Sequence, residues 1–388
     1  MPFLKESRFL ALSAANFFSR YHFYLIVFVI SSFLAGFIGS AKAEFAIAGA
    51  NAGAVLVLAL MPRIFATWGT KQVLTSLGIA EILILCSLAF AHSAALVIIL
   101  LVLMISMTFS IFLGLDFLVE AITTDESETG GVRSVFLTTS NISTLIATLT
   151  LAVILTDDSY RDVFLAASLV LVPFIMLAWR SFPKTGGTTS SEHTSAWSAI
   201  AGIARVPHVL RPIATAHLLL QLYYAWFNFY FTLYLFEHVG FSWHTIAIML
   251  ALSMAPYLLL EIPIGWIADK RLGEQEIMVG GFIVLSASIV ALALLGDNLL
   301  AWTILFLLGT CGAAAIEITT ESTFFKRVTA ADGEAISLLR ILRPVAGIMG
   351  PATAGVLLLF VPPPFLFVIF GAIVALGIPL AMSIVDTK

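Results

Sequence analysis

Three ionisable side chains lie inside long apolar stretches of this sequence, where a charge is costly. Arg20 lies among aromatic residues in NFFSRYHFY, Glu81 stands between GIA and ILIL, and Glu261 follows YLLL. In the hydrocarbon of a membrane, an ionised group costs several kcal/mol unless it is paired or in contact with water. Residues of this kind therefore indicate a site for a proton, an ion or a charged solute.

Glu81 and Glu261 are the residues that we expect to take up and release a proton. Burial favours the protonated carboxyl and a nearby arginine favours the carboxylate, so the two effects together can place titration near neutral pH. Asp116, Glu317 and His217 are further titratable groups in apolar segments. A buried acid can also serve only to join helices, and this structural role stays open. Sodium is an alternative coupling ion, but no cluster of acids points to it.

Arg20 is expected to face a cavity. There it would contact an anionic part of a solute, or hold a carboxylate whose protonation changes. The alternative is that Arg20 neutralises Glu81 or another buried acid. A bare organic cation would be a poor cargo for a site centred on this arginine.

Two stretches combine aromatic rings with a few polar groups: NFFSRYHFY at 16–24 and QLYYAWFNFYFT at 221–232. Aromatic walls of this composition suit a small amphipathic organic solute. Aromatic residues also pack helices and gather at membrane interfaces, so part of each stretch is expected to be structural. We expect the solute to contact Asn16, Arg20, Tyr24, Gln221, Tyr224 and Asn228.

The composition predicts the elements that position these residues. Of 388 residues, 60% are hydrophobic and 11% charged, far from the composition of a soluble domain. Crossing a bilayer takes about 20 apolar residues in a helix, because no water satisfies the backbone there. We therefore predict an all-α polytopic membrane protein with twelve transmembrane helices. They lie near 9–37, 43–67, 71–91, 94–120, 133–156, 162–182, 211–236, 243–268, 275–295, 298–322, 335–360 and 363–384.

The basic residues predict the topology. With the N-terminus in the cytoplasm, sixteen lysines and arginines lie near cytoplasmic segments, whereas Lys42 and Arg161 lie near the other side. Cytoplasmic loops of membrane proteins carry an excess of positive charge. We therefore expect a multi-pass protein of the cell membrane with both termini in the cytoplasm.

The chain also repeats itself. Asp116-x-x-x-Glu120 closes the fourth segment, and Glu317-x-x-x-Glu321 closes the tenth, 201 residues later. The repeat predicts two pseudo-symmetric six-helix bundles, 1–182 and 211–388, a plan found in transporters. These acids are expected to form inter-helix clamps with arginines that follow them. The clamp residues are Asp116, Glu120, Glu317, Glu321, Arg340 and Arg343, with Arg133 opposite Asp116.

A polar segment, 183–210, is predicted to join the two bundles on the cytoplasmic side. The chain enters it through SFPKTGGTTSSEHTS, which begins at Ser181 and has a composition typical of flexible linkers. Its second part, AWSAIAGIARVPHVL, has apolar residues at helical spacing, which indicates a short helix at the membrane surface.

The stretch EIPIGWIADKRLGE, from Glu261 to Glu274, carries a recognisable pattern. From Gly265 to Gly273 it resembles the cytoplasmic loop motif Gly-x-Leu-Ala-Asp-Arg-x-Gly of the major facilitator superfamily, after a Glu-x-Pro-x-Gly lead-in. Two departures matter: one extra residue precedes Gly273, and this copy lies between the eighth and ninth segments. The loop between the second and third segments has Ala66 and Thr67 where the motif has its aspartate and arginine.

The resemblance implies a transporter of the major facilitator superfamily that moves its solute by alternating access. In that family the first, fourth, seventh and tenth helices line the cavity, which matches the two aromatic stretches.

The loop motif suggests a gating latch built from Gly265, Asp269, Lys270 and Arg133. The glycine would permit close helix packing, and Asp269 would face the positive end of the fifth helix near Arg133. Alternatively, the loop is solvated and is basic only because cytoplasmic loops are.

Other classes of function find little support in the sequence. The chain has no GxxxxGK[ST] loop for ATP and no HExxH or Cys/His spacing for a metal, and Cys86 and Cys311 read as separate apolar-core residues. We expect no enzymatic activity, no cofactor and no bound metal. The expected partners are a small-molecule solute, the lipid bilayer and a proton or other coupling ion, with no nucleic acid, and we expect a monomer. A membrane-embedded sensor or enzyme without transport activity is the alternative.

Overall fold

The computed structural model of the protein describes residues 7–122, 126–155, 159–182, 208–327 and 333–384. Among residues inside helices, the side chains of Glu120, Arg133, Glu261, Asp269 and Arg340 lie outside the described set. The structural statements below concern the described part of the chain.

The described residues form helices and turns and no strand, which confirms the all-α prediction. The first six predicted segments correspond to α1 (Ser7–Val27) with α2 (Ile30–Ile38), α3 (Ser40–Trp68), α4 (Thr70–Ala89), α5 (Ala94–Ile122), α6 (Glu126–Ile154) and α7 (Tyr160–Ser181). The last six correspond to α9 (Arg211–Trp226) continued by η2 (Phe227–Phe231), α10 (Thr232–Tyr234) and η3 (Leu235–Val239), then α11 (Trp243–Ser253) with α12 (Ala255–Lys270), α13 (Glu274–Leu292), α14 (Leu299–Phe325), α15 (Gly333–Leu358), and α16 (Pro363–Ala375) with α17 (Gly377–Met382).

Ten of these described spans are long and apolar enough to cross a membrane, and Thr138–Ile154 within α6 is a shorter apolar helix. The remaining span is α9 and its continuation, where two π-helical turns, η2 and η3, interrupt the regular helix. The protein is therefore a polytopic membrane protein with the twelve predicted helical spans.

Three spans contain a break: one lies near a proline, one near a glycine, and one near neither. Pro256 at the start of α12 and Gly377 at the start of α17 account for two breaks, since a proline cannot donate to the preceding turn and a glycine weakens a helix. Between α1 and α2 no such residue is present, and the amide of Val29 instead donates to the Ile26 carbonyl at 3.0 Å. This third break therefore occurs without a helix-breaking residue.

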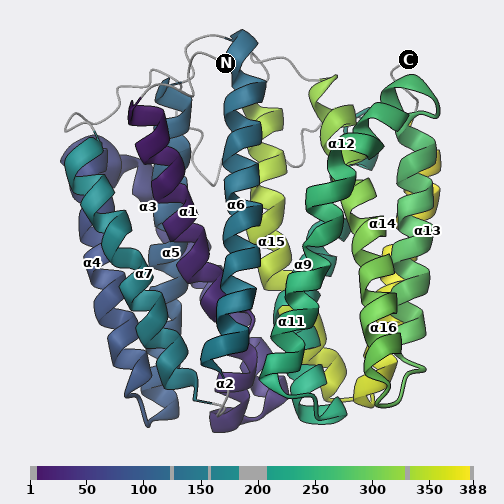
Figure 1. The fold of residues 1–388 in the computed structure, drawn as a ribbon, viewed down its shortest axis with the longest axis horizontal. Coiled ribbons are helices and arrows are strands. Elements are labelled where there is room, and N and C mark those ends of the chain that lie inside the picture. Colours follow the sequence, from purple (N-terminus) through teal and green to yellow (C-terminus); the bar gives the residue numbers. More distant parts are fainter. Residues whose placement is uncertain (1–6, 123–125, 156–158, 183–207, 328–332, 385–388) are drawn as a thin grey trace. The chain divides into compact units, whose positions relative to one another are not determined.

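The chain folds into two compact units. One consists of Met1–Gly39, Gly49–Ser195 and Ser242–Ala251, and the other of Ser40–Ala48, Ala196–Phe241 and Leu252–Lys388. In the first unit, α1 lies against α5, α6 and α7, and α4 packs against α5 and α7 at the outer edge of the picture (Figure 1). In the second, α13 packs against α14 and α16, and α9 packs against α14 and α15.

Each unit includes one short segment from the opposite half of the sequence. In the first unit, His244 of α11 donates from Nδ1 to the Ala152 carbonyl at 2.8 Å. In the second, Ser40 at the start of α3 donates to Glu237 at 2.6 Å, and the same turn of α3 lies against Gly355 of α15. The predicted linker lies outside the described residues up to residue 207, so the domain limits at 182 and 211 stay a prediction.

Close helix approach is required at one glycine pair in the second unit. A Cβ added to Gly281 of α13 would lie 2.9 Å from the carbonyl oxygen of Gly312 of α14, and the converse distance is 2.7 Å. Gly265 behaves differently from the expectation, because the nearest atom to an added Cβ there, in Ile318, is at an ordinary 3.9 Å. Helix packing therefore leaves room for a side chain at Gly265.

Candidate functional site

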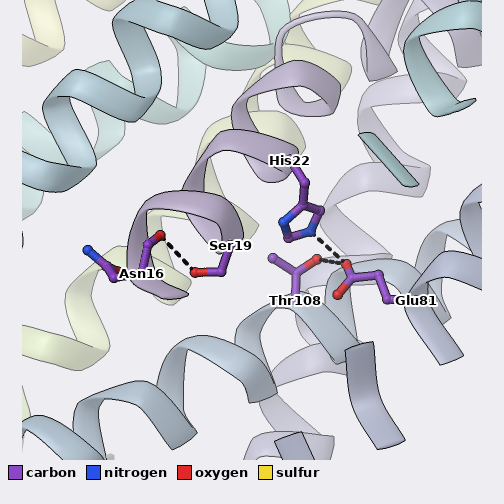
Figure 2. Close-up of polar contacts among 5 residues, drawn as sticks. All are labelled: Asn16, Ser19, His22, Glu81 and Thr108. Atoms are coloured by element: carbon purple, nitrogen blue, oxygen red, sulfur yellow. Dashed lines mark hydrogen bonds and ion pairs between the residues drawn. The ribbon is translucent and has the colours of Figure 1, made fainter. Parts of the chain in front are cut away.

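A fully buried histidine and glutamate lie side by side in the first unit. His22 of α1 and Glu81 of α4 have no exposed surface, and His22 Nε2 lies 3.1 Å from Glu81 Oε1 (Figure 2). The hydroxyl of Thr108, on α5, donates to the same carboxyl oxygen. Three helices of this unit are therefore joined at one oxygen atom.

Two atoms of this cluster have no hydrogen-bond partner among the described residues: Nδ1 of His22 and the second carboxyl oxygen of Glu81. The pair is electrically neutral when one proton is shared between His22 Nε2 and Glu81 Oε1 and a second proton is on His22 Nδ1. Loss of one of these two protons leaves a buried negative charge, which costs several kcal/mol. An orphaned imidazole N–H costs only about 1–3 kcal/mol. Burial therefore opposes a net charge on the pair.

Glu81 has its partner in His22 and not in Arg20. The Arg20 guanidinium instead lies 3.6 Å from the ring centre of Phe112 on α5, and its Nε is 3.5 Å from Asn16 Oδ1. Arg20 is half-buried. It thus presents a cation stacked on an aromatic face, an arrangement that binds well to groups combining charge and apolar surface.

Asn16 is fully buried and holds α1 to α6. Its amide nitrogen donates to the Phe136 carbonyl at 3.0 Å and to the Ser140 hydroxyl at 3.2 Å. Its side chain points away from the His22–Glu81 pair (Figure 2). The structure thus gives this predicted solute contact a role inside the bundle, where it positions Arg20. Tyr24, also predicted as a contact, is half-buried and stacks on Phe28 at 5.9 Å.

In the second unit, polar side chains follow one face of α9. Gln221 is buried; its amide nitrogen lies 3.1 Å from His217 Nε2, and its oxygen accepts from Arg343 Nε of α15 at 3.3 Å. His217 Nδ1 lies 3.4 Å from the hydroxyl of Thr320 on α14. Arg343 is exposed, so this network ends in a cation at the surface of the unit.

One turn along α9, Tyr224 donates to Glu317 of α14 at 2.7 Å. Both residues are half-buried, and the ring of Tyr257 lies 6.2 Å from that of Tyr224. Asn228 is half-buried within the π-helical turn η2. Such turns widen a helix locally and are frequent at functional sites. Tyr224 and Asn228 therefore remain partly accessible, whereas Gln221 is taken up by its neighbours.

The predicted clamps are only partly within the described side chains. Glu317 bonds to Tyr224 and Arg343 bonds to Gln221, and no ion pair joins Glu317 to Arg343 in the described part of the chain. The tyrosine supplies the hydrogen bond that an arginine was expected to supply. Asp116 and Glu321 are half-buried. Glu120, Arg133 and Arg340 lie outside the described side chains.

The predicted latch can be located only through two of its members. Gly265 lies within α12, and Lys270 is the last residue of that helix and is exposed. The side chains of Asp269 and Arg133, on which the latch depends, lie outside the described set, as does that of the predicted proton carrier Glu261.

Two contacts were missed by sequence reasoning. His22 stands in a polar stretch, and its contact with Glu81 has a weak signal in the sequence. That signal is the position of both residues midway along apolar segments. Glu274, the last residue of the stretch EIPIGWIADKRLGE, is buried and pairs with Lys326 and, at 3.1 Å, with the hydroxyl of Ser322. It fastens the start of α13 to the end of α14.

No group of three or more histidine, cysteine, aspartate or glutamate side chains gathers within the described ranges as metal ligands would. Cys86 and Cys311 are free and half-buried.

Comparison with known families gives one match that spans most of the chain. The sequence model of the major facilitator superfamily matches residues 12–351, and a second match covers 213–387. No curated protein matches the sequence.

Solved structures share the fold along the whole chain at low sequence identity. A variant of the nucleoside transporter NupG is 12% identical, with a TM-score of 0.72, covering 98% of this chain and 100% of that one. The POT family transporter PepTSo is 13% identical, with a TM-score of 0.74, covering 97% of each chain. A D-xylose-proton symporter is 14% identical, with a TM-score of 0.74, also covering 97% of each. At these identities the likeness concerns the fold alone.

Proposed function

Because this chain belongs to the major facilitator superfamily, we propose that it is a secondary active transporter of a small amphipathic organic solute with an anionic group. Transport proceeds by alternating access, in which a site between two halves opens to one side of the membrane at a time. The solute and the coupling ion are the parts of this proposal that go beyond the family.

The observation that supports the solute class is the environment of Arg20. Its guanidinium rests on the Phe112 ring at 3.6 Å and remains half-buried, so a cation and an apolar surface are offered together. A solute with a carboxylate or phosphate beside an apolar group suits this arrangement.

On α9, the accessible groups Tyr224 and Asn228 supply hydrogen bonds to the polar parts of a solute, and Arg343 supplies a second cation. Glu317, held by Tyr224 at 2.7 Å, is an acceptor on the same face of the second unit. The predicted contacts Asn16 and Gln221 act in this proposal by positioning Arg20 and Arg343.

A proton is the proposed coupling ion, with Glu81 as its carrier and Glu261 as a second acid. The burial of Glu81 beside His22, with no arginine partner among the described side chains, supports this role, and a proton symporter shares the fold. We propose that both termini lie in the cytoplasm and that the protein acts as a monomer without a cofactor.

Flux through purified protein in vesicles tests the proposal. A thermal-shift screen against organic anions, nucleosides, sugars and peptides first identifies solutes that raise the melting temperature. Each hit is then offered to proteoliposomes with and without a proton gradient. We expect solute uptake that the gradient increases. Binding without flux would support the alternative, a sensor or an enzyme that does not transport.

The latch is proposed to join Asp269 to the start of α6 near Arg133 when the site faces outward. The same vesicles test it: Asp269→Asn should slow uptake several-fold at an unchanged amount of folded protein. Glu276→Gln, which neutralises an exposed acid in the first turn of α13 outside the latch, is the matched control. Unchanged uptake by Asp269→Asn would reject the latch.

A further inference from the structure

We propose that His22 and Glu81 together form the proton-binding site, with the imidazole as the port through which the coupling proton reaches the carboxyl. This inference rests on the proposed proton coupling and adds to it a residue that carries the proton. It excludes the view of His22 as a passive tie between helices.

The geometry supports a shared site rather than two separate groups. His22 Nε2 and Glu81 Oε1 are 3.1 Å apart, and both side chains are fully buried (Figure 2). Thr108 donates to the same oxygen, so the carboxyl retains one hydrogen bond when the proton moves. In the described part of the chain, His22 and Thr108 are the hydrogen-bond partners of Glu81.

The neighbouring helices bring few other ionisable groups to the pair. On α1 itself, Arg20 is directed to Asn16 and Phe112. From α4 comes Glu81, and from α5 comes Thr108. The helix α6 faces α1 with Thr150, which bonds to Tyr21 at 2.7 Å, and α7 contributes the buried Ser168. Among the described residues, the hydrogen bonds of the pair are therefore made within the pair and with Thr108.

The free Nδ1 of His22 gives the imidazole its carrier role. When water reaches the site, a proton bound at Nδ1 makes an imidazolium, and the Nε2 proton then passes to Glu81 Oε1. The result is a neutral imidazole and a carboxylic acid, with one proton gained overall. On release, the carboxyl returns its proton to Nε2 while Nδ1 loses one to water, which leaves a carboxylate and a neutral imidazole. A histidine suits this shuttle because both ring nitrogens can exchange protons.

Access for water has a structural basis in α1. The helix breaks between Val27 and Ile30, less than two turns beyond His22, without a proline or glycine. A change in the bend at this break would move His22 relative to α4 and α5. The orphaned Nδ1 would then be the first atom of the pair to meet water.

Transport by three variants in proteoliposomes tests the pair. Glu81→Gln should lose gradient-driven accumulation about tenfold while solute exchange without a gradient continues. His22→Gln keeps a donor for Glu81 but cannot carry a proton, so gradient-driven uptake should fall about tenfold and lose its dependence on pH. His92→Gln, an exposed histidine in the turn after α4, should behave as the wild type.

Four outcomes distinguish the possibilities. A wild-type pH profile in His22→Gln would overturn the role of His22 and leave Glu81 as the sole carrier. Equal losses of exchange and accumulation, with an unchanged pH profile, would also overturn it and indicate a structural tie. A wild type without any response to the proton gradient would reject the proposed coupling itself. Parallel loss of accumulation and pH dependence, with exchange retained, supports the pair.

Infrared difference spectroscopy of the wild type keeps the inference testable if His22→Gln does not fold. Between acidic and alkaline buffer, the carboxyl band that is absent in Glu81→Gln should change over the same pH range as an imidazole band. A carboxyl change without an imidazole change would overturn the shared site.

Discussion

Arg20 shows at the residue scale how neighbouring side chains hold a charge in an apolar segment. Asn16 on α1 lies beside its Nε and is itself bonded to α6, Phe112 supports the guanidinium face from α5, and the glutamate at similar depth bonds to His22. Glu81 therefore has His22 as its partner, and the role proposed for Arg20 is to contact an anionic solute.

Replacing Arg20 by glutamine should therefore weaken binding of anionic solutes about tenfold, or about 1.4 kcal/mol. Arg161→Gln is the matched control, because this exposed arginine also lies over a ring, that of Phe90 at 4.5 Å. Titration calorimetry with a solute from the thermal screen gives the two affinities. Equal affinities in wild type and Arg20→Gln would refute the role of Arg20.

The sequence indicates which residues are unusual but not which of them meet. The apolar surroundings of Arg20 and Glu81 are visible in the printed letters, whereas their partners depend on how helices are rotated about their axes. Spacing at i and i+4 suggested a clamp for Glu317, yet its bond goes to Tyr224, because α9 presents that phenol to α14. Periodicity gives a face of a helix and not the neighbour that it touches.

At the scale of elements, helix lengths follow directly from hydropathy, while the breaks within helices do not. Pro256 makes the break between α11 and α12 predictable. The break after Val27 and the π-helical turn η2 around Asn228 have no helix-breaking residue to mark them in the sequence. The turn η2 lies inside the stretch 221–232 predicted to contact the solute, and the break follows three residues after the stretch 16–24.

The neighbouring glycines of α13 give a matched test of helix packing. Gly281→Ala would place a methyl group 2.9 Å from the Gly312 carbonyl and should destabilise the protein by about 1–3 kcal/mol. Gly280→Ala meets no atom within 4 Å and should be neutral or stabilise by up to about 1 kcal/mol. Thermal unfolding in detergent compares them, and equal melting temperatures would contradict the close contact between α13 and α14.

For the whole molecule, the distribution of basic residues predicts which ends of the helices face the cytoplasm. Replacing Cys86 and Cys311 by alanine provides a background for single cysteines at two exposed positions. A membrane-impermeant maleimide added to intact cells should label His92→Cys, after α4, and leave Thr67→Cys, near the end of α3, unlabelled. The reverse pattern would place both termini outside.

The short segments that each unit takes from the opposite half bear on how the protein is made. Residues 242–251 complete the first unit, yet they are translated only after α9 and its continuation. The ribosome therefore cannot deliver a finished first unit before well over half of the chain has been synthesised. Any chaperone or insertase that handles the nascent protein must protect the unfilled surface during this interval, and a chain cut at the linker would leave each fragment lacking a piece of its own unit.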